Sequence, residues 1–156
     1  MTKSVVALLI LTASALPAHA QKSGKWTVGF GQGLIEHAVT NGPGNRFMVV
    51  CDEGYSENAE RTSLSFTIRD REPPPKSTVR VFVGDEEFTF YADQYSETLI
   101  NNRAAHSNFV ALWEDMARGS GSIRVLFEDG RTSTFSLDGA RKALGKKPCA
   151  DSFTTR

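Results

Sequence analysis

The chain has 156 residues, and its 18 basic and 18 acidic side chains cancel to a formal net charge of zero. A chain of this length is typical of one domain built around one hydrophobic core. The balanced charge excludes the strong positive field of nucleic-acid-binding proteins and the polybasic patch of membrane-surface proteins. We therefore expect no nucleic acid among its partners.

The first twenty residues have the pattern of a secretory signal peptide. Lys3 precedes the apolar run 5–11, and the small residues Ala18 and Ala20 form an A-x-A end. The run is shorter than the roughly 20 residues that span a bilayer, so we expect no stable membrane insertion. We expect cleavage after Ala20, which leaves residues 21–156 as a single β-rich domain in the periplasm or the medium. The alternative is an uncleaved anchor.

Two cysteines, Cys51 and Cys149, are present in the whole sequence. An even number of cysteines in an exported chain predicts a disulfide bond. The alternatives are two free buried thiols or part of a metal site, although zinc needs more ligands than this pair supplies.

Apolar and polar residues alternate with a period of two over most of the chain, which indicates strands. The alternation covers 26–30, 35–39 and 64–68. The continuous apolar run 47–51 predicts a central strand. The three prolines at 73–75 cannot donate ladder hydrogen bonds, so they predict a connection between sheets.

Two hairpins follow from matching the apolar faces of successive strands. The apolar residues have odd numbers in 79–83 and even numbers in 88–92, so the loop between them must contain an even number of residues. A loop centred on 84–87 places Val83 opposite Phe88 and Arg80 opposite Tyr91. In 123–127 and 135–137 the apolar residues all have odd numbers, so the loop between these strands must contain an odd number of residues. A three-residue loop, 128–130, would place Gly130 at a left-handed position.

Two helices complete the predicted fold. Residues 108–117 carry apolar side chains at helical spacing, with Ser107 or Asn108 as the expected N-cap and Gly119 at the end. Residues 139–144 predict a short terminal helix with Asp138 as its cap. We expect a mainly β fold, a small sandwich or partly closed barrel, whose terminal helix the disulfide holds.

The segment 135–144, with the pattern F-S-L-x-G-A-x-x-A-L and followed by Cys149, resembles the end of some small exported proteins of Gram-negative bacteria. These are the invasion-associated locus B proteins and the type VI secretion accessory proteins of the VasI kind. The resemblance covers about a third of the chain. It implies a fold and a cell-envelope location far more than an activity.

No residue pattern predicts a cofactor, a metal site or a catalytic site. His37 lies on an apolar face, where a hydrogen-bonded core or edge position is expected. His106 is expected to be solvated before the helix or to form part of its cap. The glycines of 29–33 lack the lysine and helix start of a phosphate loop, so they predict a bent or bulged strand.

Two acidic segments are candidates for partner recognition. The first follows Cys51 and contains Asp52, Glu53, Tyr55 and Glu57; the second is the turn with Asp85 and Glu86. We expect them to form a protein-binding rim, because a loop rooted by a disulfide is a common place for recognition.

These observations favour an exported, non-catalytic accessory or interaction protein, linked by its resemblance to secretion or host interaction. The expected partner is a protein of the envelope or the extracellular space. Two alternatives remain: an inhibitor or immunity protein against an envelope-acting toxin or lysozyme, and a hydrolase whose site the sequence does not reveal.

Overall fold

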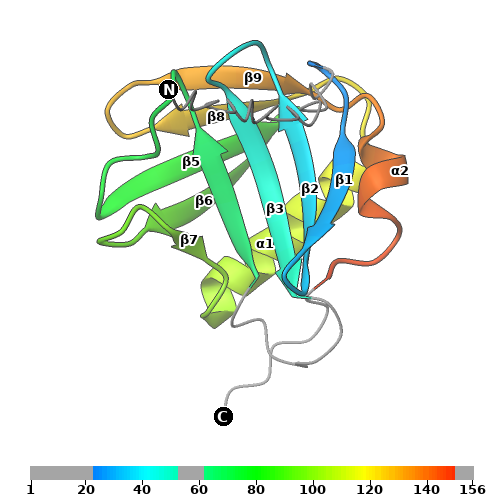
Figure 1. The fold of residues 1–156 in the computed structure, drawn as a ribbon. Helices are drawn as coiled ribbons and strands as arrows, with labels where there is room; N and C mark the ends of the chain where they lie inside the picture. Colours follow the sequence, from blue (N-terminus) through cyan, green and yellow to red (C-terminus); the bar gives the residue numbers. More distant parts are fainter. Residues whose placement is uncertain (1–22, 53–61, 150–156) are drawn as a thin grey trace, which may run out of the picture.

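The computed structural model describes residues 23–52 and 62–149, which form two antiparallel sheets and two helices (Figure 1). The predicted mainly β fold is confirmed. The sheets do not close on each other, so the architecture is a β-sandwich and not a barrel. The sandwich arises because each strand buries alternate side chains and needs a second layer to cover them.

The larger sheet has five strands in the order β1-β2-β3-β4-β7. These strands are β1 (Thr27–Gly31), β2 (Leu34–Thr40), β3 (Arg46–Asp52), β4 (Ser63–Thr67) and β7 (Thr98–Leu99). The apolar run 47–51 lies in β3, at the centre of the sheet, as predicted. Although the run is continuous, β3 buries only its alternate residues, because one face of the sheet is turned away from the core.

The smaller sheet has four strands in the order β6-β5-β8-β9. These strands are β5 (Ser77–Val83), β6 (Glu86–Ala92), β8 (Ser122–Phe127) and β9 (Thr132–Ser136). The prolines at 73–75 lie between β4 and β5, so they connect the two sheets as predicted. The two helices are α1 (Arg103–Arg118) and α2 (Ala140–Leu144).

An aromatic cluster joins the two sheets in the core. The rings of Phe47 on β3 and Phe66 on β4 are stacked, with centroids 5.1 Å apart and planes 7° apart. Phe47 also contacts Phe135 on β9, and Phe66 contacts Phe127 on β8. Such aromatic pairs contribute roughly 0.5–1.5 kcal/mol each beyond the area they bury.

Helix α1 begins earlier than the sequence predicted. Its N-cap is Asn102, whose Oδ1 accepts the Ala105 N–H at 3.0 Å, and not Ser107 or Asn108. Asn108 lies inside the helix and donates to the Thr89 carbonyl at 2.8 Å. Gly119 ends the helix as expected, but with an ordinary φ of −71°; a side chain there would meet the Leu137 methyl group at 2.5 Å.

Helix α2 begins one residue later than predicted, and its cap differs. Gly139 is the N-cap, whereas the Asp138 side chain forms a 3.3 Å ion pair with Lys25. The Asp138 carbonyl accepts the Trp26 N–H at 3.2 Å. Asp138 therefore ties the end of the chain to the start of β1.

The structure confirms one predicted hairpin and corrects the other. The β8–β9 loop has three residues, and Gly130 lies in its left-handed position with a φ of 86°. In the β5–β6 hairpin, Val83 pairs with Glu86 and Arg80 pairs with Thr89. The loop therefore has an even number of residues, as predicted, but it has two residues and not four. Matching the apolar faces cannot distinguish registers that differ by two residues, because both put the same side chains on the same face.

The glycine-rich segment 29–33 is also simpler than predicted. Strand β1 pairs regularly with β2 as far as Gly31 opposite Leu34. Gln32 and Gly33 both have positive φ angles, 54° and 76°, and form a two-residue turn. This is the backbone pattern of a type I′ hairpin, so the strand is neither bent nor bulged.

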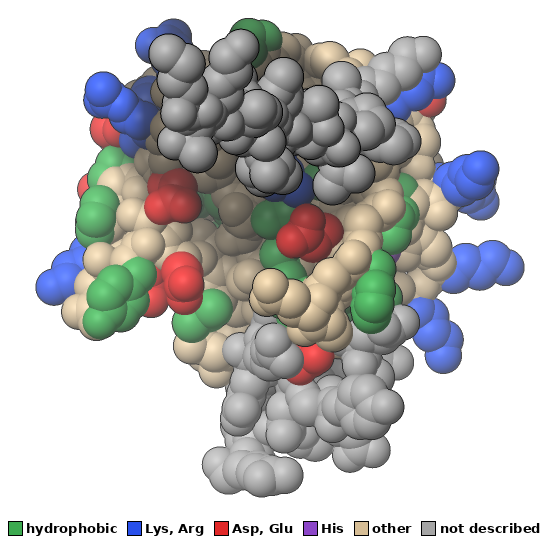
Figure 2. Space-filling model, in the orientation of Figure 1, with side chains coloured by type: hydrophobic (Ala, Val, Ile, Leu, Met, Phe, Trp, Pro, Cys, Tyr) green, Lys and Arg blue, Asp and Glu red, His purple; other side chains and the backbone are tan. Residues whose placement is uncertain are grey.

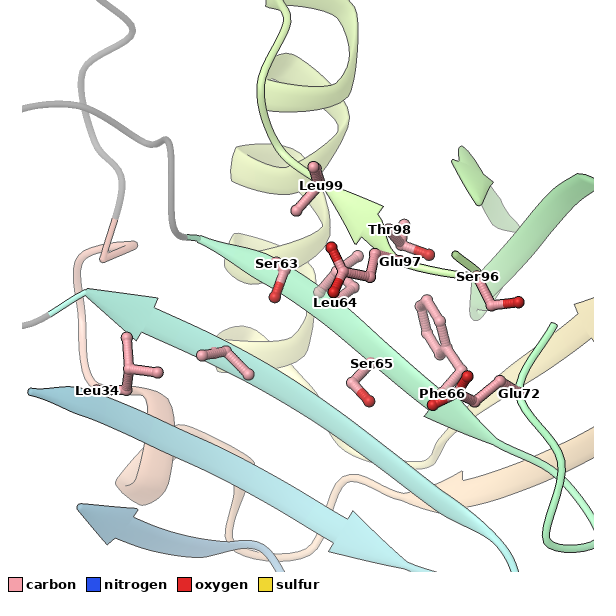
Figure 3. Close-up of a pocket in the computed structure, with 11 residues that line it drawn as sticks. Leu34, Ser63, Leu64, Ser65, Phe66, Glu72, Ser96, Glu97, Thr98 and Leu99 are labelled. Atoms are coloured by element: carbon pink, nitrogen blue, oxygen red, sulfur yellow. The ribbon is translucent and has the colours of Figure 1, made fainter. Parts of the chain in front are cut away.

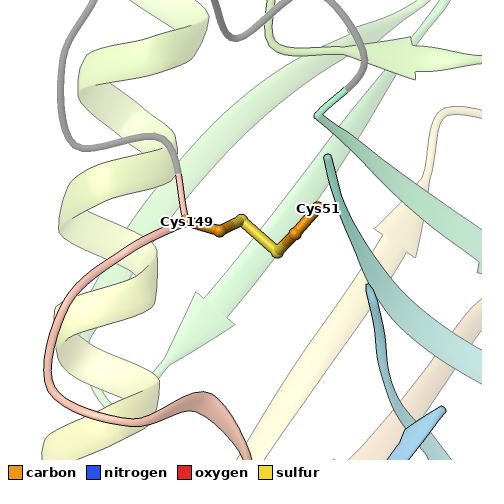
Figure 4. The surroundings of a disulfide bond; sticks show 2 residues. All are labelled: Cys51 and Cys149. Carbon is orange, nitrogen blue, oxygen red and sulfur yellow. A yellow bond between two sulfur atoms is a disulfide. The ribbon is translucent and has the colours of Figure 1, made fainter. Parts of the chain in front are cut away.

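The predicted disulfide joins Cys51 to Cys149 (Figure 4). Cys51 is buried on β3, and Cys149 lies in the segment after α2, with 5.8 Å between the two Cα atoms. The bond spans 98 positions of sequence and fixes the end of the chain to the central strand. The terminal helix is therefore held by the disulfide, as predicted.

We predict that the double variant Cys51→Ala with Cys149→Ala loses about 2–5 kcal/mol of unfolding free energy, because its unfolded chain is no longer cross-linked. Urea denaturation of the oxidised wild type, the reduced wild type and the double variant measures the effect. The reduced protein and the variant should agree. An unchanged urea midpoint in both would contradict a stabilising role for the bond.

Candidate functional site

A groove with a volume of about 410 Å³ lies on the five-stranded sheet, along the side of β4 that faces β7 (Figure 3). Its lining combines hydroxyl groups, carboxylates and apolar side chains from β2, β3, β4, β7 and two turns. The lining residues are Leu34, Val50, Ser63, Leu64, Ser65, Phe66, Glu72, Ser96, Glu97, Thr98 and Leu99.

The hydrogen bonds of β4 show which main-chain groups face this groove. The Thr62 carbonyl accepts the Ile100 N–H at 3.1 Å, on the β7 side. Ile68 exchanges two hydrogen bonds with Arg71, at 2.9 and 3.3 Å. Because successive residues of a strand direct their main-chain groups to opposite edges, the even-numbered residues of β4 face the groove edge.

Phe66 is the even-numbered residue of β4 that this edge leaves unpaired. Leu64 pairs with Thr98 on one side of it, and the Ile68 bridge lies on the other. No residue in the described ranges pairs with Phe66 between them, because the chain turns away at Ser96, which has a φ of 66°. Phe66 therefore has no ladder partner on this edge among the described residues, and the residue as a whole is only 2% exposed.

The turn 93–97 holds one wall of the groove. Oδ1 of Asp93 accepts the N–H groups of Tyr95 at 2.7 Å and Glu97 at 3.0 Å. The Asp93 N–H donates to the Glu97 carbonyl, and the Ser96 N–H donates to the Asp93 carbonyl. These four bonds position the Ser96 hydroxyl and the Glu97 carboxylate.

A buried hydroxyl in the groove lining has no hydrogen-bond partner. Thr98 is 1% exposed, and its Oγ1 is unpaired in the described part of the chain. An unpaired buried polar group costs about 1–3 kcal/mol. Thr98 lies opposite the buried Leu64, so its side chain points to the core face of the sheet and not into the groove.

Arg131 fixes the opposite wall of the groove from the other sheet. Its guanidinium group donates to the carbonyls of Ile68 at 3.3 Å, Arg71 at 3.1 Å and Glu72 at 2.8 Å. A further bond to Asp129 orients the guanidinium group. The fork of an arginine is suited to several acceptors at once, so one side chain holds the whole turn that carries Glu72.

We predict that Arg131→Lys lowers the free energy of unfolding by about 2 kcal/mol, because an ammonium group cannot reach all of these carbonyls. Arg124→Lys is the matched control, since Arg124 lies over the Phe82 ring, 3.9 Å from its centre. Thermal and urea denaturation of both variants measure the difference. Equal stability losses in the two variants would argue against a stabilising role for the Arg131 hydrogen bonds.

The charge on this face of the molecule is mainly acidic near the groove. Figure 2 shows acidic side chains over the five-stranded sheet, with most lysines and arginines at its margin. Glu36 is paired with Arg46 at 3.4 Å. Glu72 and Glu97 have no ion-pair partner within residues 23–52 and 62–149. The groove therefore presents two free carboxylates.

The predicted protein-binding rim is divided by the fold. Asp52 ends β3 in the larger sheet, whereas Asp85 lies in the β5–β6 turn and Glu86 begins β6 in the smaller sheet. The remaining predicted site residues lie outside the described residues: Glu53, Tyr55 and Glu57 of the rim, and Ala18 and Ala20 of the cleavage site. The rim stays a prediction, and the groove is separate from Asp85 and Glu86.

The two histidines of the described chain are buried. His37 is 7% exposed on β2, and its ring packs edge-on against Trp113 of α1 at 5.4 Å, which agrees with the expected core position. Burial lowers the pKa of His37, and a hydrogen bond with the backbone of Ala143 partly opposes this shift. His106 lies within the first turns of α1 and is buried, so it is not the solvated residue that the sequence suggested.

We predict that stability falls as the pH drops below about 6.5, the ordinary histidine pKa. Since His37 has a lowered pKa in the folded state, the unfolded chain binds its proton first. The contribution of neutral His37 to the free energy of unfolding is fully present above the pKa that His37 has in the unfolded chain. It is lost as the pH falls toward the lower pKa that His37 has in the folded protein. Urea midpoints between pH 7.5 and about 5 measure it. His37→Phe, which keeps a ring on Trp113, should flatten the slope; an unchanged slope would assign it to another group.

Exposed apolar side chains lie on two other parts of the surface. Val28 and Phe30 of β1 are 55% and 69% exposed at the edge of the larger sheet. Tyr95, 71% exposed, precedes Ser96 in the turn 93–97 but is not among the residues that line the groove. Tyrosine is one of the residue types that are enriched in protein interfaces.

The described residues show neither a metal cluster nor a spanning helix. No three His, Cys, Asp or Glu residues within these ranges lie close enough to hold a metal ion. No helix there is long and apolar enough to cross a membrane.

The sequence did not reveal the groove, because its lining comes from separate strands and turns without a shared motif. The signal that was available is the turn around Asp93, where the chain leaves β4 before it reaches a position opposite Phe66.

The comparisons with known proteins give one match. A protein-family model described as YfjT matches residues 24–144, which is most of the chain. No curated protein and no solved structure matches the chain.

Proposed function

The chain belongs to the YfjT family, and we propose that it is an exported, non-catalytic binding protein of the bacterial envelope that takes a positively charged partner in the β4 groove. The observation that carries the proposal is the groove itself, whose lining includes the exposed carboxylates of Glu72 and Glu97, neither of which is paired with a described cation.

Export is supported by three features. The first twenty residues have the signal-peptide pattern, and the Cys51–Cys149 bond is of the kind that persists in oxidising compartments. The resemblance of segment 135–144 to exported Gram-negative proteins supports the same location. The finer assignment to the periplasm or the medium is part of this proposal.

The rigidity of the groove supports binding. The Asp93 bonds hold one wall and the Arg131 bonds hold the other, so little has to be ordered when a partner arrives. A pre-formed site loses less conformational entropy on binding than a flexible one. The exposed Tyr95 supplies a side chain of the type that often dominates interface energies.

Capture from a bacterial envelope extract tests the proposal. The exported chain, whose first residue by mass spectrometry should be Gln21, is immobilised beside the double variant Glu72→Gln with Glu97→Gln. We expect the wild type to retain envelope protein that salt releases, and the double variant to retain at most about a tenth as much.

Glu114→Gln is the matched control, because Glu114 is an exposed carboxylate on α1, away from the groove lining. It should retain as much protein as the wild type. Equal retention by all three chains would contradict a role for the groove. Recovery of exported protein that begins at Met1 would contradict the proposed cleavage.

A further inference from the structure

We propose that the open edge of β1 pairs with the same edge of a second copy of this chain, so that two larger sheets join across a two-fold axis. The two strands run antiparallel, with Val28 of each copy opposite Phe30 of the other and the two Gly29 residues at the centre. This inference does not depend on the groove, which lies at the β4–β7 end of the same sheet.

The main-chain groups of Val28 and Phe30 point outward from the edge of the larger sheet, where β1 lies (Figure 1). The Trp26 N–H donates to the Asp138 carbonyl at 3.2 Å, so it points away from β2. Because successive residues of a strand direct their main-chain groups to opposite edges, those of Val28 and Phe30 also point away from β2. No hydrogen bond within residues 23–52 and 62–149 satisfies them, and the two residues are 55% and 69% exposed.

The other sheet edges are covered by side chains or are short. On β9, the Thr134 and Ser136 carbonyls accept hydrogen bonds from the Asn41 side chain at 2.8 Å and the Trp26 ring at 2.9 Å. On β6, a side chain of α1 donates to the main chain at 2.8 Å, and β7 has only two residues. Proteins usually protect edges in these ways or with charges and prolines, whereas residues 27–31 of β1 contain no charge and no proline.

The open part of β1 has the length that a symmetric pairing needs. The Asp138 carbonyl closes the edge at Trp26, and a tight turn ends the strand after Gly31. Residues 27–31 remain open, which is about 17 Å of strand. Two such segments pair along their whole length when the two-fold axis passes through the middle residue, Gly29.

This register also suits the hydrogen bonds of both copies. It places Val28 opposite Phe30, and these are the two residues whose main-chain groups point outward. Such residues exchange both of their hydrogen bonds when they face each other in an antiparallel pair. At the centre, Gly29 faces its own copy in a pair without hydrogen bonds, where the Cα atoms approach to about 4.5 Å and the absence of a side chain leaves room.

The side chains of the open segment complement those of a second copy. Val28 and Phe30 point to the same face as Trp26, which is only 7% exposed, so the core face of β1 loses its cover after Trp26. In the pair, each Val28 lies beside a Phe30, an aliphatic–aromatic contact that stabilises neighbouring strands. The opposite face carries Thr27 and two glycines, so no bulky or charged side chains meet there.

A second copy is a better occupant than an unrelated strand, because the segment is complementary to itself in both hydrogen bonds and side chains. The formal net charge of zero means that no long-range repulsion opposes the pairing. Five residues on each side are far fewer than the roughly 20–30 of a stable complex. We therefore expect a weak dimer, with a dissociation constant on the order of 100 μM.

Sedimentation velocity of the exported chain with its disulfide intact tests the pairing. Between about 10 μM and 1 mM the average mass should rise from that of a monomer toward that of a dimer. Phe30→Lys should weaken the dimer at least about tenfold, because it places a charge in the apolar contact. Tyr91→Lys is the matched control, since Tyr91 is 59% exposed on β6, another edge strand, and it should leave the dimer unchanged.

Cysteine cross-linking tests the register. Gly29→Cys faces its own copy and should form an intermolecular disulfide under mild oxidation, whereas Gly31→Cys faces Thr27 and should do so at least about tenfold more slowly. An added Cβ meets no atom closer than 4.0 Å at either glycine, so both variants should fold. Circular dichroism, the denaturation midpoint and mass mapping of the native disulfide check each variant.

Three outcomes would overturn the inference: a monomer at every concentration, a dimer that Phe30→Lys does not weaken, or equal cross-linking at positions 29 and 31. A monomer whose Val28 amide is protected by a strand of another protein would show that the edge has a different occupant. Capture from the envelope extract depends on Glu72 and Glu97 and should be unaffected by Phe30→Lys, so the two proposals fail independently.

Discussion

The stacked rings of Phe47 and Phe66 fix the position of β4 against β3, and the groove depends on that position. Their planes are nearly parallel, and they pair directly across the two strands. A slip of one residue would turn the Phe66 ring out of the core and bring a serine in, because strand side chains alternate between faces. The core contact therefore also decides which main-chain groups of β4 face the groove.

The shape of the groove depends on two other contacts, which hold its walls in place. Arg131 reaches from the smaller sheet to the turn after β4, and Asp93 closes the turn before β7. Hydrogen bonds from charged side chains therefore hold both turns that form the walls of the groove.

The sequence predicted most of the fold but not the groove. Matching the apolar faces predicted the β8–β9 register, because a glycine also marked the left-handed position of the loop. The predicted β5–β6 register was wrong by two residues, because Glu86 and Phe88 lie on the same face of the strand and the matching cannot separate them. The start of α1 was missed because Asn102 caps a turn with few apolar residues. The groove depends on which strand ends meet, and the order of strands in a sheet has no local signal in the sequence.

The disulfide and the groove are connected through β3. Cys51 faces the core and the preceding residue, Val50, faces the groove, because neighbouring residues of a strand point to opposite sides. The bond holds the end of β3 to the end of the chain, so it restrains the strand on which one side of the groove is built. A binding site that is rigid before the partner arrives loses little entropy when it fills. Loss of the disulfide should therefore weaken the binding of a partner in the groove even where the chain remains folded. Such a loss of affinity in a folded chain would show that the bond contributes to binding as well as to stability.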